Sequence, residues 1–382
     1  MSDNDEILGI EKRRALIGIV LALALTLAAV AVIGQVTSFG KLLDAARQAN
    51  KAWLPLCLVG QLVAYVGYLM AYHCVALADG GPRLRHRDAA QVITLGLGAY
   101  VIGSGAGGLT VDFWAMKQAG ARLHQAARRT LALNTLQAAG LTWLAAVAGA
   151  VALAVGAGGR AGFWMAVFWV TVVPTATAAA YALSGRRFGP RLMQAPAGED
   201  RPRTWRPGPW LPWIRAKLRK ALADAIGGVV FSRHVIAHPR RYTAGVLGYP
   251  LFWFGDFLIL WVALRAFGVD LEPWRLVVAE ATAWALSFLP LPGGGSGAAE
   301  ATIAYTLHAV GVPLSPALFA ALTYRAVNFW LPLFPALALV PRVPRLQQSL
   351  RRAERTSRDE DAMLHGDEGT AADWEEEEEA AA

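Results

Sequence analysis

Apolar residues in this chain gather in blocks of about 20, the length an α-helix needs to cross roughly 30 Å of hydrocarbon. Full-length blocks lie at 15–34, 53–78, 130–155, 162–184, 242–264 and 316–340. Two further apolar regions, 89–111 and 275–311, are interrupted by glycines. Counting the second as a span plus a returning half-helix gives seven spans, whereas counting it as two short helices gives a hairpin. Because lipid leaves backbone groups no water to bind, these blocks predict an all-α, polytopic membrane protein.

Composition and charge placement exclude several other classes. Only 17% of the 382 residues are charged, whereas a soluble domain carries about a quarter. The net charge of +8 lies between the apolar blocks, as membrane topology requires, so we expect no nucleic-acid partner. The first block, 15–34, exceeds the apolar core of a signal peptide and reads as an uncleaved span. Cys57 and Cys74 fall about 25 Å apart on one predicted helix, too far to bridge.

The distribution of lysine and arginine predicts the orientation. The segments between the apolar blocks lie alternately on the two sides of the membrane. Of the 36 lysines and arginines, 29 fall on one side and six on the other, and Arg325 alone lies within a span. Since basic residues stay in the cytoplasm, both termini are predicted to be cytoplasmic, in a bacterial-type inner membrane.

The same census constrains the two glycine-interrupted regions. Basic residues flank 89–111 on both sides, so this region enters and leaves from the cytoplasm, while 275–311 enters and leaves from outside. The two predicted re-entrant hairpins, each between two spans, form an inverted repeat, as in secondary transporters. The alternative is that 89–111 is an ordinary span and one loop violates the charge rule.

The predicted organisation has five parts. They are a cytoplasmic N-terminus (1–14), a first membrane half (15–184, hairpin at about 89–128), a basic cytoplasmic segment (185–241), a second membrane half (242–344, hairpin at about 275–311) and a disordered cytoplasmic tail (345–382). The basic segment has an apolar stripe over 214–229, which fits an interfacial helix on anionic lipid or a solvated connector equally well.

The first hairpin carries a glycine cluster that includes Gly105, Gly107 and Gly108. The spacing of Gly103, Gly105 and Gly108 formally matches a dinucleotide fingerprint, but no βαβ unit surrounds it. Glycines that open a half-helix expose N–H groups that favour an anion such as phosphate. Close packing of helices through small residues explains the cluster equally well.

The second hairpin places charged side chains at membrane depth. Its break contains Gly293, Gly294, Gly295, Ser296 and Gly297, and Glu300 follows in the first turn of the next helix. Arg325, with Tyr324 directly before it and Asn328 three residues after it, lies about 13 Å inside the following span. Ionisable groups at such depth are costly and face the protein interior. We expect Glu300 and Arg325 to be partners, either binding a lipid phosphate or forming a structural ion pair.

Three other acidic residues, Asp112, Asp256 and Glu280, also fall in apolar segments and are candidates for a proton or ion relay. Asp112 fits a helix cap as well, and Asp256 fits a bond to a neighbouring hydroxyl. We expect no metal and no cofactor, because no cluster of metal-ligating residues is apparent.

The second hairpin and the span after it carry one extended pattern, which comprises Pro290 to Gly297 with Glu300, then Gly311-Val312-Pro313, Tyr324-Arg325 and Trp330-Leu331-Pro332. This pattern resembles the lysylphosphatidylglycerol synthase transmembrane region family, flippase-like membrane proteins also called the YbhN-type family. Trp114, Lys117 and Gly120 are similar to the family's other signature, and the resemblance covers about residues 10–345. The glycine run is one residue longer than the family pattern, and Ala106 and Asp112 stand where many members carry basic residues.

The resemblance implies that the protein moves a phospholipid or polyprenyl-linked lipid between leaflets. We expect no synthase activity, because the aminoacyl transferase of bifunctional relatives is a large soluble domain. The sequence has no phosphate-binding GxxxxGK[ST] loop, so we expect no ATP hydrolysis. Alternatives are a membrane-embedded enzyme and an accessory subunit that binds lipid- or glycan-synthesis enzymes.

Overall fold

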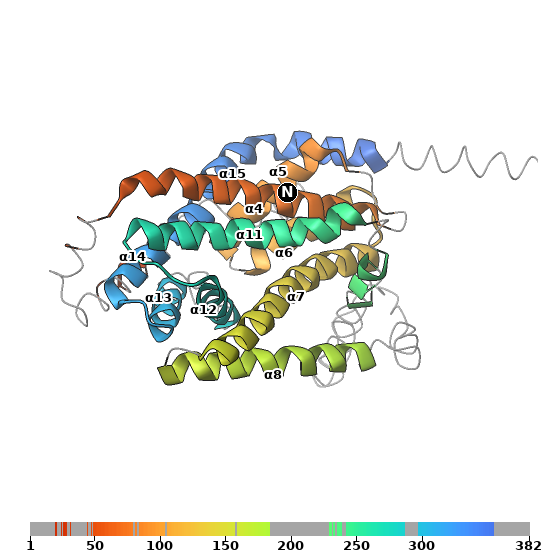
Figure 1. Ribbon diagram of the computed structural model, residues 1–382. Coiled ribbons are helices and arrows are strands. Elements are labelled where there is room, and N and C mark those ends of the chain that lie inside the picture. Colours follow the sequence, from red (N-terminus) through yellow and green to blue (C-terminus); the bar gives the residue numbers. More distant parts are fainter. Residues whose placement is uncertain are drawn as a thin grey trace, which may run out of the picture.

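The computed structural model describes most of the chain in six long stretches. They are residues 49–78, 84–103, 105–156, 159–183, 242–286 and 297–354, together with residues 20, 24, 26–28, 31, 44, 47, 81, 229–230, 232–233 and 235–238. In these stretches every regular element is a helix (Figure 1). Most of the predicted first span and of the segment predicted as an interfacial helix lies outside the described residues.

The helices follow the apolar blocks of the sequence. Their bounds are α4 (Leu54–Leu77), α5 (His86–Gly103), α6 (Gly105–Gln118), α7 (Leu123–Val155), α8 (Gly159–Leu183), α11 (Thr243–Ala266), α12 (Pro273–Leu286), α13 (Ala298–Ala309), α14 (Leu314–Arg325) and α15 (Leu333–Leu339). A 3₁₀ turn (Lys51–Trp53) precedes α4, a π-helical segment (Ala326–Trp330) joins α14 to α15, and a second 3₁₀ turn (Val340–Arg342) follows α15.

Five stretches in the described part are long and apolar enough to cross a membrane. They are Lys51–Ala76, Gln125–Val155, Gly159–Ala180, Thr243–Ala266 and Leu314–Glu354. They match the five predicted spans from residue 53 onward, so the prediction of an all-α polytopic membrane protein is confirmed.

Two predicted boundaries differ from the helix ends in the structure. Helix α7 begins at Leu123, so the first hairpin ends at Gln118 rather than at about 128. After the second 3₁₀ turn the chain remains helical to Glu354, past the predicted start of the tail at 345. Leu346 and Leu350 are buried, and Ser349 donates a hydrogen bond to Asp88 at the start of α5 at 2.8 Å. Tertiary packing on α5 and α6 therefore extends a helix that composition alone ended too early.

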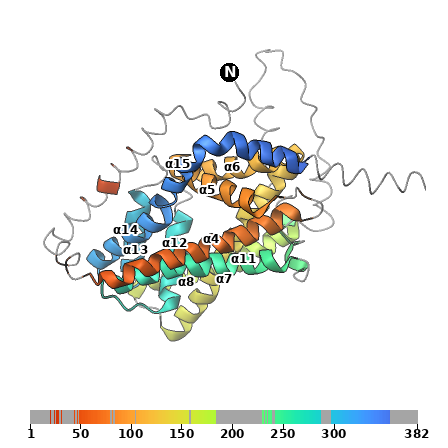
Figure 2. The ribbon, with the colours of Figure 1, turned by 90° about the horizontal axis from the view of Figure 1, so that it is seen from above.

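Helices α4 and α11 form the centre of the bundle and pack antiparallel with their backbones in contact (Figures 1 and 2). Gly60 faces Gly255 and Gly67 faces Gly248. A Cβ atom on Gly67 would lie 2.4 Å from the backbone nitrogen of Phe252, too close for any side chain. Small residues are the usual means of bringing two membrane helices this close.

The glycine-interrupted regions each fold into two short helices, and the two pairs lie toward opposite ends of the bundle (Figure 2). Helices α5 and α6 connect to the C-terminal end of α4 and the start of α7. Helices α12 and α13 connect to the C-terminal end of α11 and the start of α14. Because α4 and α11 are antiparallel, their C-terminal ends lie at opposite ends of the bundle.

The turns that follow the two pairs share one backbone geometry. Gly120 and Gly311 have positive φ angles of 95° and 105°. The next residue in each turn, Ala121 or Val312, donates a hydrogen bond of 3.1 Å to the carbonyl five residues earlier. In addition, α5 packs on α15 and α12 packs on α7, the exchange of partners that an inverted repeat requires. The repeat itself stays a prediction.

The polarity of the described part is inverted relative to a soluble protein. Large apolar side chains such as Leu62, Val147, Trp164, Phe254 and Phe334 are exposed on the outer faces of the helices. Charged side chains are buried inside, and these are Asp88, Asp112, Arg129, Asp256, Glu280, Glu300 and Arg325. An apolar exterior around a charged interior is the arrangement expected where lipid surrounds the helices.

Candidate functional site

The candidate site begins at the break in the second hairpin. Gly297 caps α13 with a φ of 79°, a conformation that glycine adopts without strain. Its N–H donates to Glu300 Oε2 at 2.5 Å, so the carboxylate binds the N-terminal end of its own helix. As the sequence predicts, Glu300 lies in the first turn of this helix, and it is fully buried. Gly293, Gly294, Gly295 and Ser296 lie outside the described residues.

Arg325, the last residue of α14, reaches the same carboxylate. Its Nε lies 3.2 Å from Glu300 Oε1, and the Thr26 hydroxyl donates to that oxygen at 3.4 Å. Its Cζ stands 3.7 Å from the centre of the Phe329 ring, a cation–π contact. Arg325 Nη2 is buried and binds no acceptor among the described residues. The ion pair therefore uses only part of the donor capacity of the guanidinium.

A second polar cluster lies beside this pair, across α11, α12 and α14. Asp256 accepts hydrogen bonds from the Tyr324 hydroxyl, at 3.0 Å, and from the Asn328 side-chain amide. The Asn328 amide also donates to the Tyr324 oxygen at 2.9 Å. Glu280 of α12 acts electrostatically on Asp256 and Tyr324. The fold thus brings Tyr324 and Asn328, which lie one residue before and three residues after Arg325, onto the buried carboxyl group of Asp256.

Asp112 belongs to a separate cluster in the first half. It lies on α6 and accepts a hydrogen bond from the Tyr68 hydroxyl of α4 at 3.4 Å. Tyr72 and Tyr249 also interact with it electrostatically. Of the three residues predicted as a relay, the structure brings Asp256 and Glu280 together and leaves Asp112 apart from them.

The glycines of the first hairpin serve close packing in this structure. Helix α6 begins at Gly105. A Cβ atom on Gly107 would lie 2.0 Å from the carbonyl oxygen of Ala99 in α5, and one on Gly108 would lie 3.4 Å from that of Gly96. For Gly107 the geometry favours helix packing over an open anion site.

Sequence reasoning missed the tyrosines around Asp112. Tyr65, Tyr68 and Tyr72 stand three and four residues apart on α4, which places their hydroxyls on one helical face. Tyr65 donates to the carbonyl of Ala90 in α5 at 2.7 Å, and Tyr68 donates to Asp112. Hydroxyls at helical spacing within an apolar block were the signal that could have found them.

A comparison with protein families identifies the family of the chain. The family described as "Lysylphosphatidylglycerol synthase TM region" matches residues 19–336, which include both hairpins, Glu300 and Arg325. The chain belongs to this family. Membership indicates a multi-pass membrane protein related to lipid metabolism or transport. None of the curated proteins compared with it shows significant sequence similarity.

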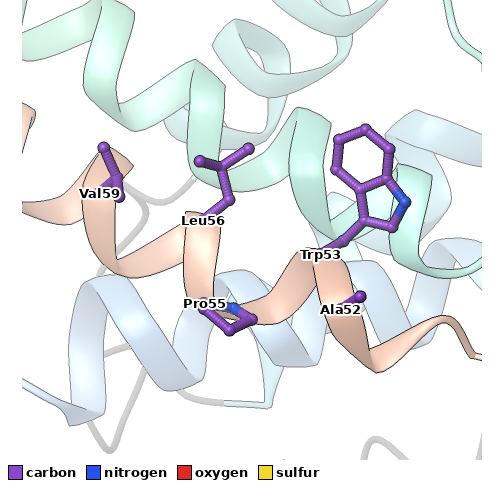
Figure 3. A pocket seen from close by; sticks show the side chains of 5 residues that line it. All are labelled: Ala52, Trp53, Pro55, Leu56 and Val59. Atoms are coloured by element: carbon purple, nitrogen blue, oxygen red, sulfur yellow. The ribbon is translucent and has the colours of Figure 1, made fainter.

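The buried charged side chains are the chemically distinctive part of this protein. An open depression at the start of α4 is lined by Ala52, Trp53, Pro55, Leu56 and Val59 and contains none of the candidate residues (Figure 3). Among the described residues, no group of three or more His, Cys, Asp and Glu side chains is arranged to hold a metal ion. The site offers one buried guanidinium with an unused donor, at Arg325, and three buried carboxyl groups, those of Asp256, Glu280 and Glu300.

Proposed function

We propose that the protein is a flippase-like transporter that binds a phospholipid or lipid-linked phosphate headgroup and moves it between leaflets. The observation that carries this proposal is the buried Arg325, which is held by Glu300 through one nitrogen and keeps Nη2 without a partner in the described part of the chain.

The donor pattern of Arg325 suits a phosphate. A guanidinium presents five N–H donors in a planar fork that matches phosphate oxygens. Glu300 occupies Nε at 3.2 Å, which leaves the terminal nitrogens for a second anion. A buried ion pair contributes little net stability compared with apolar packing, because both charges lose their water. Its presence inside a bundle with an apolar exterior therefore supports a binding role.

The arrangement of the hairpins supports movement between leaflets. Helices α5–α6 and α12–α13 lie toward opposite ends of the α4–α11 pair, and the turns after them share one geometry. We propose that the two halves are inverted repeats that rock around the site to expose it to each leaflet in turn. The proposed location is the inner membrane, with both termini in the cytoplasm, as the distribution of basic residues indicates.

We propose anionic phospholipids or polyprenyl-linked lipids as the cargo, and enzymes of lipid or glycan synthesis as partners that supply or consume it. The transporter would move the lipid without making or breaking a covalent bond.

Reconstitution tests the proposal. The full-length protein is placed in lipid vesicles with fluorescent phosphatidylglycerol or a fluorescent polyprenyl phosphate, and a membrane-impermeant quencher reports how fast label crosses the bilayer. We expect the wild type to accelerate crossing and Arg325→Ala to lose at least ten-fold of that acceleration. Arg325→Lys keeps the charge but not the fork, so an intermediate rate is expected. Arg342→Ala, at an exposed arginine further along the chain, is the matched control and should behave as the wild type.

Three outcomes contradict the proposal. Arg325→Ala vesicles that move label as fast as the wild type would remove the role of the guanidinium. Chemical conversion of the lipid would assign an enzyme instead. Failure of the wild type to move either lipid, together with co-purification of a synthesis enzyme, would assign an accessory subunit.

A further inference from the structure

Asp256 and Glu280 form a pair of buried carboxyl groups that the phosphate site does not use. Asp256 lies on α11 and Glu280 on α12, and each is only 3% exposed. Both groups are held between helices whose outer faces are apolar, so neither carboxyl group is open to bulk water. A carboxylate in such a place needs a donor, a cation or a proton.

The hydrogen bonds around the pair are unequal. Asp256 receives two donors, the Tyr324 hydroxyl at 3.0 Å and the Asn328 amide. Neither oxygen of Glu280 has a hydrogen-bond donor among the described residues. Tyr324 lies near Glu280 as well, but a hydroxyl has a single proton, and Tyr324 gives it to Asp256. The two donors therefore favour ionisation of Asp256 over ionisation of Glu280.

Among the residues that the structure describes, no basic side chain is paired with either carboxyl group. Arg325 follows Tyr324 on α14, but its Nε is directed to Glu300 of α13. On α4, Tyr68 donates to Asp112 and Cys57 donates to the carbonyl of Ile259. The apolar part of α7 over 130–155 carries no titratable side chain, and α8 meets α12 through Trp169 and Thr282. Two adjacent, desolvated carboxyl groups without a cation cannot both ionise, so one proton is shared between them.

We propose that Asp256 and Glu280 form a proton-binding site whose occupation is coupled to the anionic headgroup at Arg325. This inference rests on the proposed function. Tyr324 connects the carboxyl pair to the anion site at Arg325. Its hydroxyl donates a hydrogen bond to Asp256, it directly precedes Arg325 in the chain, and it interacts electrostatically with both Asp256 and Arg325. An anion at Arg325 makes the surrounding potential more negative and so favours the proton on the pair. By linkage, the bound proton favours the anion to the same extent.

The π-helical segment Ala326–Trp330 gives this coupling a mechanical element. It begins directly after Arg325, and the Asn328 amide within it donates to Asp256. Wide π turns are costly in a helix and concentrate at functional positions. A change in the charge of Asp256 therefore alters a bond that holds the irregular turn beside Arg325.

The first test reads the proton directly and needs no transport. Infrared difference spectra of the full-length protein in lipid membranes are recorded as the pH is raised. We expect a band from a protonated carboxyl group that shifts in heavy water. It should be lost in Glu280→Gln and displaced in Asp256→Asn. Asp270→Asn is the control. It removes an exposed carboxylate in the loop after α11, which pairs with Arg265 of that helix, and should leave the band unchanged.

The second test imposes a pH difference across the reconstituted vesicles and measures lipid movement. We expect the wild-type rate to change at least three-fold with the direction of the gradient, and Asp270→Asn to respond equally. Glu280→Gln and Asp256→Asn should move lipid at a rate that does not depend on the direction of the gradient, whatever that rate is. Their size-exclusion profiles should match that of the wild type.

The outcomes separate the two proposals. Wild-type vesicles that move no lipid but show the Glu280-dependent band overturn the proposed function and the coupling, and leave the proton site. Lipid movement that ignores the gradient, with no such band, overturns the proton site and leaves the transporter. A pair that responds to sodium instead of pH overturns the proton assignment.

Discussion

Removing the Glu300 carboxylate should destabilise the protein more than removing Glu300 and Arg325 together. Glu300 is fully buried and accepts hydrogen bonds from Arg325, Gly297 and Thr26. In Glu300→Ala the Arg325 guanidinium stays buried without its counter-charge, which costs about 3–5 kcal/mol. Loss of the bond to the Gly297 N–H at the start of α13 adds about 1 kcal/mol.

In the double variant Glu300→Ala/Arg325→Met the buried charge is absent, and mainly the loss at the helix start remains. The double variant should therefore be about 2–4 kcal/mol more stable than the single one. Reversible unfolding of the purified protein in mixed micelles, followed by tryptophan fluorescence, measures both differences. Glu272→Ala is the control, because that glutamate is half-exposed in its pair with Arg275 and should change stability by less than about 1 kcal/mol.

This reasoning is refuted if the double variant is as unstable as Glu300→Ala. That result would mean that Arg325 is solvated in the folded protein, and that the buried ion pair does not govern the energetics of the site.

Two further variants test the packing that positions the site. Gly67→Ala places a Cβ atom 2.4 Å from the backbone nitrogen of Phe252, which cannot move aside, so the free energy of unfolding should fall by about 1–3 kcal/mol. Gly162→Ala, whose Cβ would meet only the Ala309 oxygen at 3.7 Å, should cost nothing measurable in the same unfolding assay, and equal effects would contradict the close approach of α4 and α11. Arg129→Met removes bonds from one guanidinium nitrogen to the carbonyls of Val75, Ala76 and Ala78, at 2.9, 3.2 and 2.5 Å. The end of α4 should then exchange its amide hydrogens at least ten-fold faster by mass spectrometry, and unchanged protection there would show that Arg129 does not cap the helix.

The apolar blocks were sufficient to predict the helices. A membrane span must make all its backbone hydrogen bonds within one helix, so the length of an apolar block indicates the length of that helix. The glycine and proline breaks correctly divided both hairpins into two short helices. Charge placement also made Glu300 and Arg325 candidates for partners, since buried opposite charges at this depth seek each other.

What the sequence could not supply was side-chain proximity across helices. Nothing in the spacing of Asp112, Asp256 and Glu280 indicates that two of them meet and one does not. The structure places Asp112 on α6 beside Tyr68 of α4, whereas Asp256 and Glu280 lie on α11 and α12. The continuation of the last helix beyond 345 was equally hidden, because it depends on burial of Leu346 and Leu350 against the first hairpin.

The most direct test of lipid binding is an experimental structure of the full-length protein in nanodiscs that contain phosphatidylglycerol. The account predicts density for a lipid phosphate within hydrogen-bonding distance of the terminal nitrogens of Arg325, with the acyl chains leaving between helices toward the bilayer. A guanidinium fully enclosed by protein side chains, with no headgroup near it, would contradict the proposed role of Arg325.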